Sequence, residues 1–84
     1  MKVYYVTFRS VTYAQRGQAR LTAQGIDCTL RRTPKWMENQ GCGYCLQISE
    51  GWGREAVRIL HRDGVEFRKI YLKREDGTME EVQL

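Results

Sequence analysis

The stretch Leu21-Thr22-Ala23-Gln24-Gly25-Ile26 decides the fold, because Leu60-His61-Arg62-Asp63-Gly64-Val65 repeats its pattern later in the chain. In both copies a leucine is followed, four positions on, by a glycine and then by a branched apolar residue. A glycine in the left-handed conformation commonly ends a helix, and the apolar residue after it packs back on the last turn. Each copy therefore predicts the end of a helix, and the two helices belong to two successive strand–helix–strand units.

The remaining elements follow from the apolar pattern around these two helix ends. We expect helices at 11–24, with Ser10 as N-cap, and at 52–63, and strands at 3–8, 27–31, 44–48 and 66–73. Asp76-Gly77 is a hairpin turn signal, so residues 79–84 are expected to form a short C-terminal edge strand. This order of elements predicts an α+β fold, a ferredoxin-like βαββαβ sandwich with both helices on one face of an antiparallel sheet.

Length and composition limit the class of protein. A chain of 84 residues predicts a single domain spanning 1–84, and a hydrophobic content of 42% favours a folded domain over a disordered tail. The net charge of +4 and the pI of about 9.2 favour acidic partners, although a solvated basic surface is the commoner explanation. The three cysteines are an odd number, and no stretch resembles a signal peptide or a membrane span. We therefore expect a cytoplasmic protein whose cysteines are thiols.

The stretch from Thr33 to Leu46 contains the main candidate for chemistry. Gly41 and Gly43 flank Cys42, which lets the backbone hinge there and leaves the sulfur without bulky neighbours in the sequence. Directly after this loop, apolar and polar residues alternate from Tyr44 to Ile48, which predicts a strand. The pattern indicates a thiol presented where a loop enters a strand.

The motif Cys42-Gly43-Tyr44-Cys45 allows three interpretations. A redox pair needs Cα atoms within about 7 Å of each other, whereas three residues of extended chain separate them by roughly 10 Å. A zinc site needs four ligands, and Cys28 and His61 are the further candidates. However, Cys28 shares a strand face with Leu30, which predicts burial, and His61 fits a helix C-terminus, where positive charge is favourable. We therefore expect neither a disulfide nor a metal at this motif.

In the third interpretation Cys42 is a single working thiol and Cys45 is an accessory. Four basic residues lie at strand ends or in the loop itself: Arg9, Arg31, Arg32 and Lys35. Positive charge nearby stabilises a thiolate, which is the nucleophilic form of cysteine, and could also hold an anionic ligand. The alternative is that Cys42 is an ordinary loop residue and that the four cations are simply solvated.

A combination of local motifs then extends over residues 3 to 72. They are Tyr5 to Phe8, the Gly25-Ile26 helix end, Pro34-Lys35 before a polar loop, Cys42-Gly43 opening a strand, and the second helix ending in Asp63-Gly64-Val65. With these motifs the chain resembles a small domain family described as putative selenium/sulfur carrier protein-like. The resemblance implies a carrier rather than a complete enzyme, in which Cys42 accepts sulfur or selenium from a donor protein and passes it to an acceptor protein. It implies no cofactor.

Two details of this chain differ from the family pattern. The family usually has arginine where Lys35 stands, and lysine lacks the planar fork that grips an oxyanion at two points. Cys45 is not part of the pattern, which leaves its accessory role resting on the motif alone.

Two alternatives come from other functional classes. An RNA-binding module has the same order of elements and stacks bases on aromatic side chains of its central strands, here Tyr4 or Tyr5 and Tyr44. Tyr44, however, shares a strand side with Leu46 and Ile48, which favours a place in the core. The other alternative is a ligand-sensing or assembly domain that forms a homodimer through its sheet.

Overall fold

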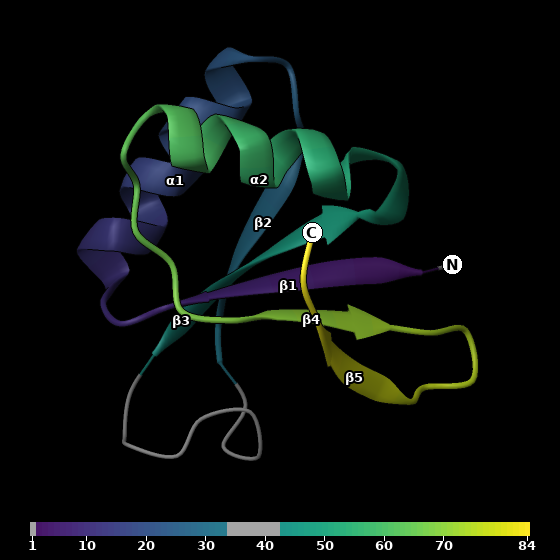
Figure 1. Ribbon diagram of the computed structural model, residues 1–84. Coiled ribbons are helices and arrows are strands. Elements are labelled where there is room, and N and C mark those ends of the chain that lie inside the picture. Colours follow the sequence, from purple (N-terminus) through teal and green to yellow (C-terminus); the bar gives the residue numbers. More distant parts are fainter. Residues whose placement is uncertain (1, 34–42) are drawn as a thin grey trace.

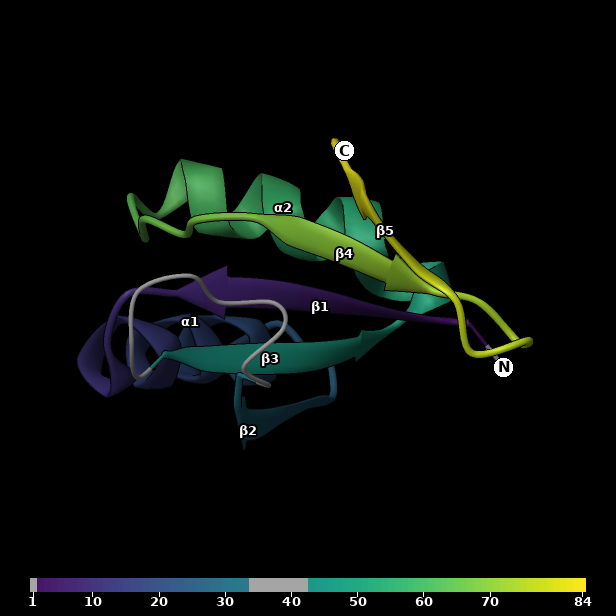
Figure 2. The ribbon, with the colours of Figure 1, turned by 90° about the horizontal axis from the view of Figure 1, so that it is seen from below.

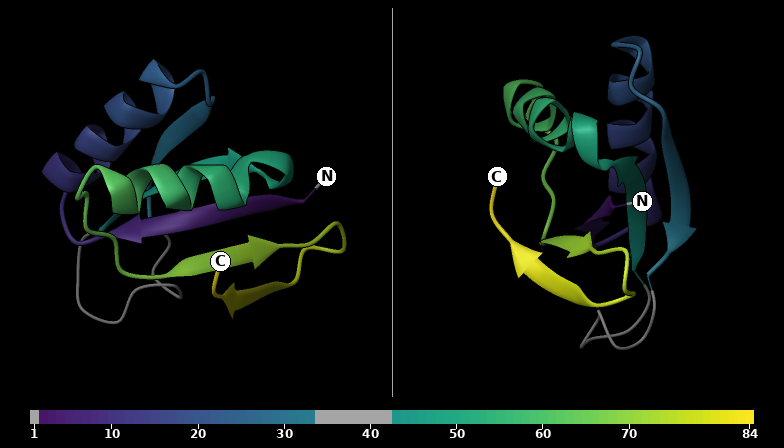
Figure 3. Two further views of the ribbon diagram at one scale, coloured as in Figure 1. Left: turned by 45° about the horizontal axis from the view of Figure 1, so that its top comes forward. Right: turned by 90° about the vertical axis from the view of Figure 1, so that its right-hand side faces the viewer.

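The computed structural model describes residues 2–33 and 43–84. Its elements in chain order are β1 (Val3–Phe8), α1 (Val11–Ala23), β2 (Cys28–Arg32), β3 (Tyr44–Ser49), the 3-10 turn η2 (Glu50–Trp52), α2 (Gly53–Arg62), β4 (Ile70–Lys73) and β5 (Met79–Val82). The strands form one antiparallel sheet in the order β2-β3-β1-β4-β5, and both helices cover the same face of it (Figures 1 and 3). The predicted α+β class and the C-terminal edge strand are confirmed.

The hydrophobic core fills the space between the helices and the sheet. Its largest fully buried side chains come from both layers: Val6, Phe8, Leu46 and Ile48 from the sheet, and Leu21, Ile59 and Leu60 from the helices. Alternate residues of each strand point into this core, as the period of a strand requires.

Both helices end with the motif that the repeated stretch predicted. In α1 the amides of Gly25 and Ile26 bond to the carbonyls of Thr22 and Leu21, both at 3.0 Å. In α2 the amides of Gly64 and Val65 bond to the carbonyls of His61 and Leu60 at 3.2 and 2.9 Å. Gly25 and Gly64 have φ of +81° and +69°, a conformation in which a side chain would be strained. The local sequence therefore sets both helix ends.

The predicted fourth strand, 66–73, is too long at its start. β4 begins at Ile70 because a bulge opposite Thr7 interrupts the pairing with β1. The carbonyl of Thr7 accepts from the amide of Arg68 at 2.7 Å, and the hydroxyl of Thr7 accepts from the amide of Lys69 at 3.0 Å. The bulge leaves residues 66–69 as an irregular segment beside the end of β1.

The two faces of the sheet differ in what they carry. Tyr4, Val6 and Phe8 lie on the face that the helices cover, with Tyr44 directly opposite Phe8. The other face, which we call the open face, carries Tyr5 and Thr7 from β1, and Figure 2 looks onto it. Among residues 2–33 and 43–84, no helix is both long and apolar enough to cross a bilayer.

Candidate functional site

Thr33 and Gly43, the described residues on either side of the candidate loop, meet at one end of the sheet. Arg32 lies opposite Tyr44 in the β2–β3 pairing, and beyond them the amide of Thr33 donates to the carbonyl of Gly43 at 3.0 Å. Both Thr33 and Gly43 are buried. Three of the predicted site residues, Lys35, Gly41 and Cys42, lie outside the described residues.

The predicted cations Arg9, Arg31 and Arg32 all reach this end of the sheet, but on different sides. Arg31 faces the open side, directly across from Cys45. Arg32 is on the helix-covered side, where its guanidinium lies 5.7 Å from the centre of the Tyr44 ring. Arg9 follows the last residue of β1. The structure thus gathers three of the four predicted cations at one end without directing them at a single point.

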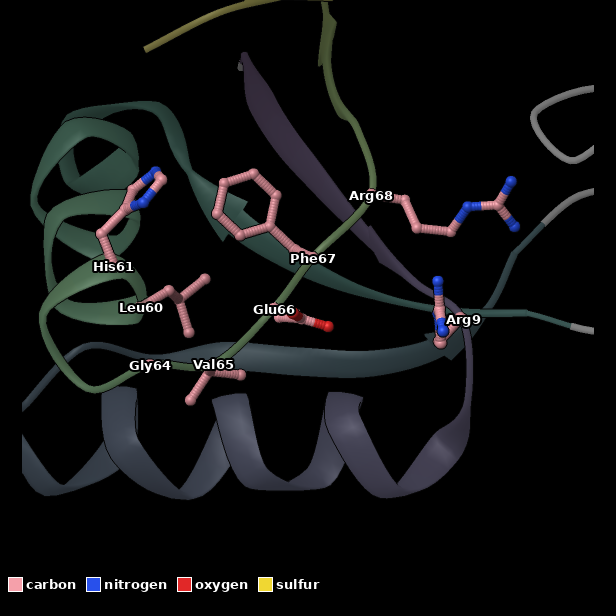
Figure 4. A pocket seen from close by; sticks show the side chains of 8 residues that line it. All are labelled: Arg9, Leu60, His61, Gly64, Val65, Glu66, Phe67 and Arg68. Carbon is pink, nitrogen blue, oxygen red and sulfur yellow. The ribbon is translucent and has the colours of Figure 1, made fainter.

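A fourth arginine at this end, Arg68, was missed by the sequence prediction. The bulge opposite Thr7 places it beside the end of β1, where it lines a pocket together with Arg9 (Figure 4). We call Arg9, Arg31, Arg32 and Arg68 the basic end of the sheet. No local signal could have identified Arg68, because its position depends on a pairing between residues about sixty positions apart.

Cys45 lies on the opposite strand face from Leu46, as predicted, but it is fully buried, with 0% of its surface exposed. Its neighbours across the strands are Thr7 and Arg31, and the Thr33 hydroxyl is close enough to affect its ionisation. Burial raises the pKa of the Cys45 thiol, and Thr33 and the positive charge of Arg31 offset part of this rise. The Thr33 hydroxyl oxygen is itself buried without a well-aligned hydrogen-bond partner among the described residues.

Cys28 faces the helices beside Leu30, as predicted, but it is half-buried rather than buried. The reason is the strand order, which places β2 at the edge of the sheet. Desolvation raises the pKa of the Cys28 thiol, a hydrogen bond with Thr22 opposes this, and the nearby charge of Asp27 adds to the rise. Cys28 and Cys45 are both free cysteines.

These shifts predict how the two thiols react. In a Cys42→Ser variant, we expect iodoacetamide at neutral pH to modify Cys28 and Cys45 more slowly than a free model thiol, and Cys45 more slowly than Cys28. Both rates should keep rising above the ordinary thiol pKa of about 8.5. Peptide mapping after timed alkylation measures each rate, and labelling of Cys45 as fast as the model thiol would contradict its burial.

The raised pKa values of Cys28 and Cys45 also make the stability of the fold depend on pH. The folded protein keeps these thiols protonated to a higher pH than the unfolded chain does. Their contribution to stability is therefore present below the pKa of a free thiol and is lost as pH rises through the raised pKa values.

The tyrosines of the RNA-binding alternative do not form the expected platform. Tyr4 and Tyr44 face the helices, and only Tyr5 of the three lies on the open face. Tyr71 of β4 lies directly opposite Tyr5, so the aromatic pair on this face differs from the predicted one. The pairing of β1 with β4, which sequence spacing could not give, accounts for the difference.

The described residues offer no ready metal site. Within 2–33 and 43–84, no group of three or more histidine, cysteine or acidic side chains lies close enough together to hold a metal ion. His61 instead packs edge-on against Phe67, with 5.2 Å between ring centres and 80° between ring planes.

The model of the family described as putative Se/S carrier protein-like matches residues 3–72, which includes both helices, strands β1 to β3 and most of β4. No curated protein and no solved structure matches the chain. The match covers most of the 84 residues, and the chain therefore belongs to the Se/S carrier protein-like family.

Proposed function

We propose that this protein carries sulfur or selenium between partner proteins, with Cys42 as the residue that holds the transferred atom. The observation that carries the proposal is the family match over residues 3–72, which spans the whole cysteine-containing stretch from Thr33 to Leu46. The family name indicates selenium or sulfur as the cargo, and a carrier requires a protein that donates and a protein that accepts.

The environment of the other two cysteines supports the assignment to Cys42. Cys45 is fully buried, and burial raises its thiol pKa, so it is neither accessible to a partner nor readily ionised. Cys28 is half-buried at the sheet edge, with its thiol pKa also raised. A carrier needs an accessible thiolate, and neither of these residues provides one at neutral pH. Cys45, the proposed accessory, acts in this scheme through packing alone.

The transfer needs no oxidant. The Cys42 thiolate attacks the terminal sulfur of a donor persulfide, a new sulfur–sulfur bond forms on Cys42, and the donor leaves as a thiolate. In the second step a thiolate of the acceptor attacks the outer sulfur, and Cys42 leaves as a thiolate. Selenium replaces the outer sulfur in the equivalent selenopersulfide exchange. Electrons and atoms balance in both steps, and no cofactor takes part.

The basic end of the sheet supports both ionisation and docking. Arg9, Arg31 and Arg32 come to the sheet end from which the loop departs, and Lys35 belongs to the loop itself. Cations within roughly one Debye length, about 8–10 Å at moderate salt, favour the thiolate form. The same charges would attract an acidic surface on a donor or acceptor.

The first test is loading of the whole protein. Incubation with a cysteine desulfurase and cysteine should add one sulfur atom to the intact mass, and reduction with dithiothreitol should remove it. An unchanged mass with a desulfurase that loads its known acceptor would count against the carrier function.

A charge variant tests the role of the loop cation. Lys35→Glu should raise the pKa of Cys42 and slow its alkylation at neutral pH by about threefold to tenfold, because each pKa unit changes the thiolate fraction about tenfold. Lys73→Glu is the control, since it makes the same change of charge at the far end of β4, opposite Val3. The pH dependence of alkylation gives the pKa in each protein, and an equal effect of both substitutions would argue against a local role for Lys35.

The scaffold supports a ferredoxin-like assignment. The first four strands follow the order β4-β1-β3-β2, and the helices lie on one face.

The proposed location is the cytoplasm, whose reducing conditions keep free thiols such as Cys28 and Cys45 unpaired.

A further inference from the structure

The pocket beside the basic end is large enough for a small molecule. It has a volume of about 540 Å³ and lies between the end of α2, the irregular segment before β4, and Arg9 at the end of β1. Pockets of roughly 300–1,000 Å³ are typical of small-ligand sites.

One wall of the pocket is apolar. Leu60 and Val65 are almost fully buried there, and the half-buried ring of Phe67 lies beside them with His61 edge-on to it (Figure 4). The backbone fixes this wall, because the amide of Val65 bonds to the carbonyl of Leu60 at 2.9 Å. The wall is therefore in place before any ligand enters.

The other side of the pocket carries charge of both signs. The guanidinium groups of Arg9 and Arg68 extend to the same side, and the carboxylate of Glu66 points that way as well (Figure 4). None of these three side chains forms an ion pair with another described residue. Elsewhere among the described residues, five ion pairs do form. The amide of Arg68 is held by the carbonyl of Thr7 at 2.7 Å, so its Cα is fixed.

Two cations, one carboxylate and an apolar wall match the groups of one class of ligand. We propose that this pocket binds a free α-amino acid with an apolar side chain. Its carboxylate lies between Arg9 and Arg68, its ammonium faces Glu66, and its side chain packs on the half-buried ring of Phe67. A simple oxyanion would use the arginines but would be repelled by Glu66 and would leave the exposed part of the Phe67 ring uncovered. The inference goes beyond the carrier function and does not depend on it.

Titration of the isotope-labelled protein, followed by NMR, tests the ligand class. L-leucine at millimolar concentrations should cause saturable shifts in the amides of residues 64–69. N-acetyl-L-leucine lacks the ammonium, and L-leucinamide lacks the carboxylate, so each should bind about tenfold more weakly or worse. The dipeptide glycyl-L-leucine separates a free amino acid from the C-terminus of a protein, and binding as tight as that of L-leucine would overturn the proposal.

Matched variants test the residues. Arg9→Gln and Arg68→Gln should each weaken L-leucine binding by about tenfold. Glu66→Gln should weaken L-leucine binding but leave binding of N-acetyl-L-leucine unchanged or stronger, because that ligand carries no ammonium. Arg54→Gln on the exposed side of α2 removes the same charge without touching the pocket and should have no effect. No saturable shifts with L-leucine, equal sensitivity to Arg54→Gln, or inorganic phosphate binding as tightly as L-leucine would each overturn the assignment.

Discussion

Replacing Cys42 by serine is expected to abolish loading of sulfur from a cysteine desulfurase. A serine hydroxyl stays protonated at neutral pH and forms no persulfide, so no atom of the side chain can accept the transferred sulfur. The measurement is the intact mass after incubation with the desulfurase and cysteine, with unaltered thermal unfolding as evidence that the variant is folded. Loss of loading should be complete rather than partial.

The matched controls are the other two cysteines. Cys28→Ser changes a half-buried thiol at the sheet edge, and Cys45→Ala changes a buried thiol of raised pKa, so both variants should keep most of the loading. If Cys42→Ser still accepted sulfur and Cys45→Ala did not, the reactive thiol would be Cys45, and the strand around it would have to open for transfer.

The parts of the fold that sequence could predict are those set by neighbouring residues. The two helix ends follow from a glycine and the apolar residue after it, and the hairpin follows from Asp76-Gly77, where Gly77 has φ of +87°. Thr78 donates its amide to the Asp76 carboxylate at 2.9 Å, which completes the turn. Each of these features involves residues within about five positions of one another. Local chemistry was sufficient for them.

The features that sequence could not predict depend on distant pairing. Alternation placed Cys45 on the correct face, but the period of a strand alone does not predict that 0% of its surface is exposed. The shortening of β4 and the position of Arg68 both follow from how Thr7 bonds to the chain about sixty residues later. Cys28 shares the core face with Leu30, yet its exposure depends on β2 being the edge strand. Around the candidate site, the position of Arg68 and the different burial of Cys28 and Cys45 therefore could not be predicted from the sequence.

The second prediction with a large effect is that Gly53→Ala lowers the stability of the fold, because the start of α2 lies very close to Tyr4 of β1. A Cβ atom added at Gly53 would lie 2.3 Å from both Cδ2 and Cε2 of the Tyr4 ring, which is far inside normal contact distance. The Tyr4 ring packs against the core on the helix-covered face, so it cannot move aside without losing buried contacts. We expect the free energy of unfolding to fall by about 1–3 kcal/mol, the usual cost of overpacking. Urea denaturation with an unchanged m-value measures it.

The sign of the Gly53→Ala effect is diagnostic, because helix propensity acts in the opposite direction. Gly53 has φ of −58° and ψ of −50°, which alanine adopts without strain, and alanine is favoured over glycine within helices by about 1 kcal/mol. Gly51→Ala is the control, since nothing lies within 4 Å of its added Cβ and its φ is not positive. A double variant that also carries Tyr4→Ala should recover the cost of Gly53→Ala relative to Tyr4→Ala alone. Gly53→Ala as stable as the wild type would mean that the ring of Tyr4 can leave its place against α2, and the packing described for this end of the helix would then be wrong.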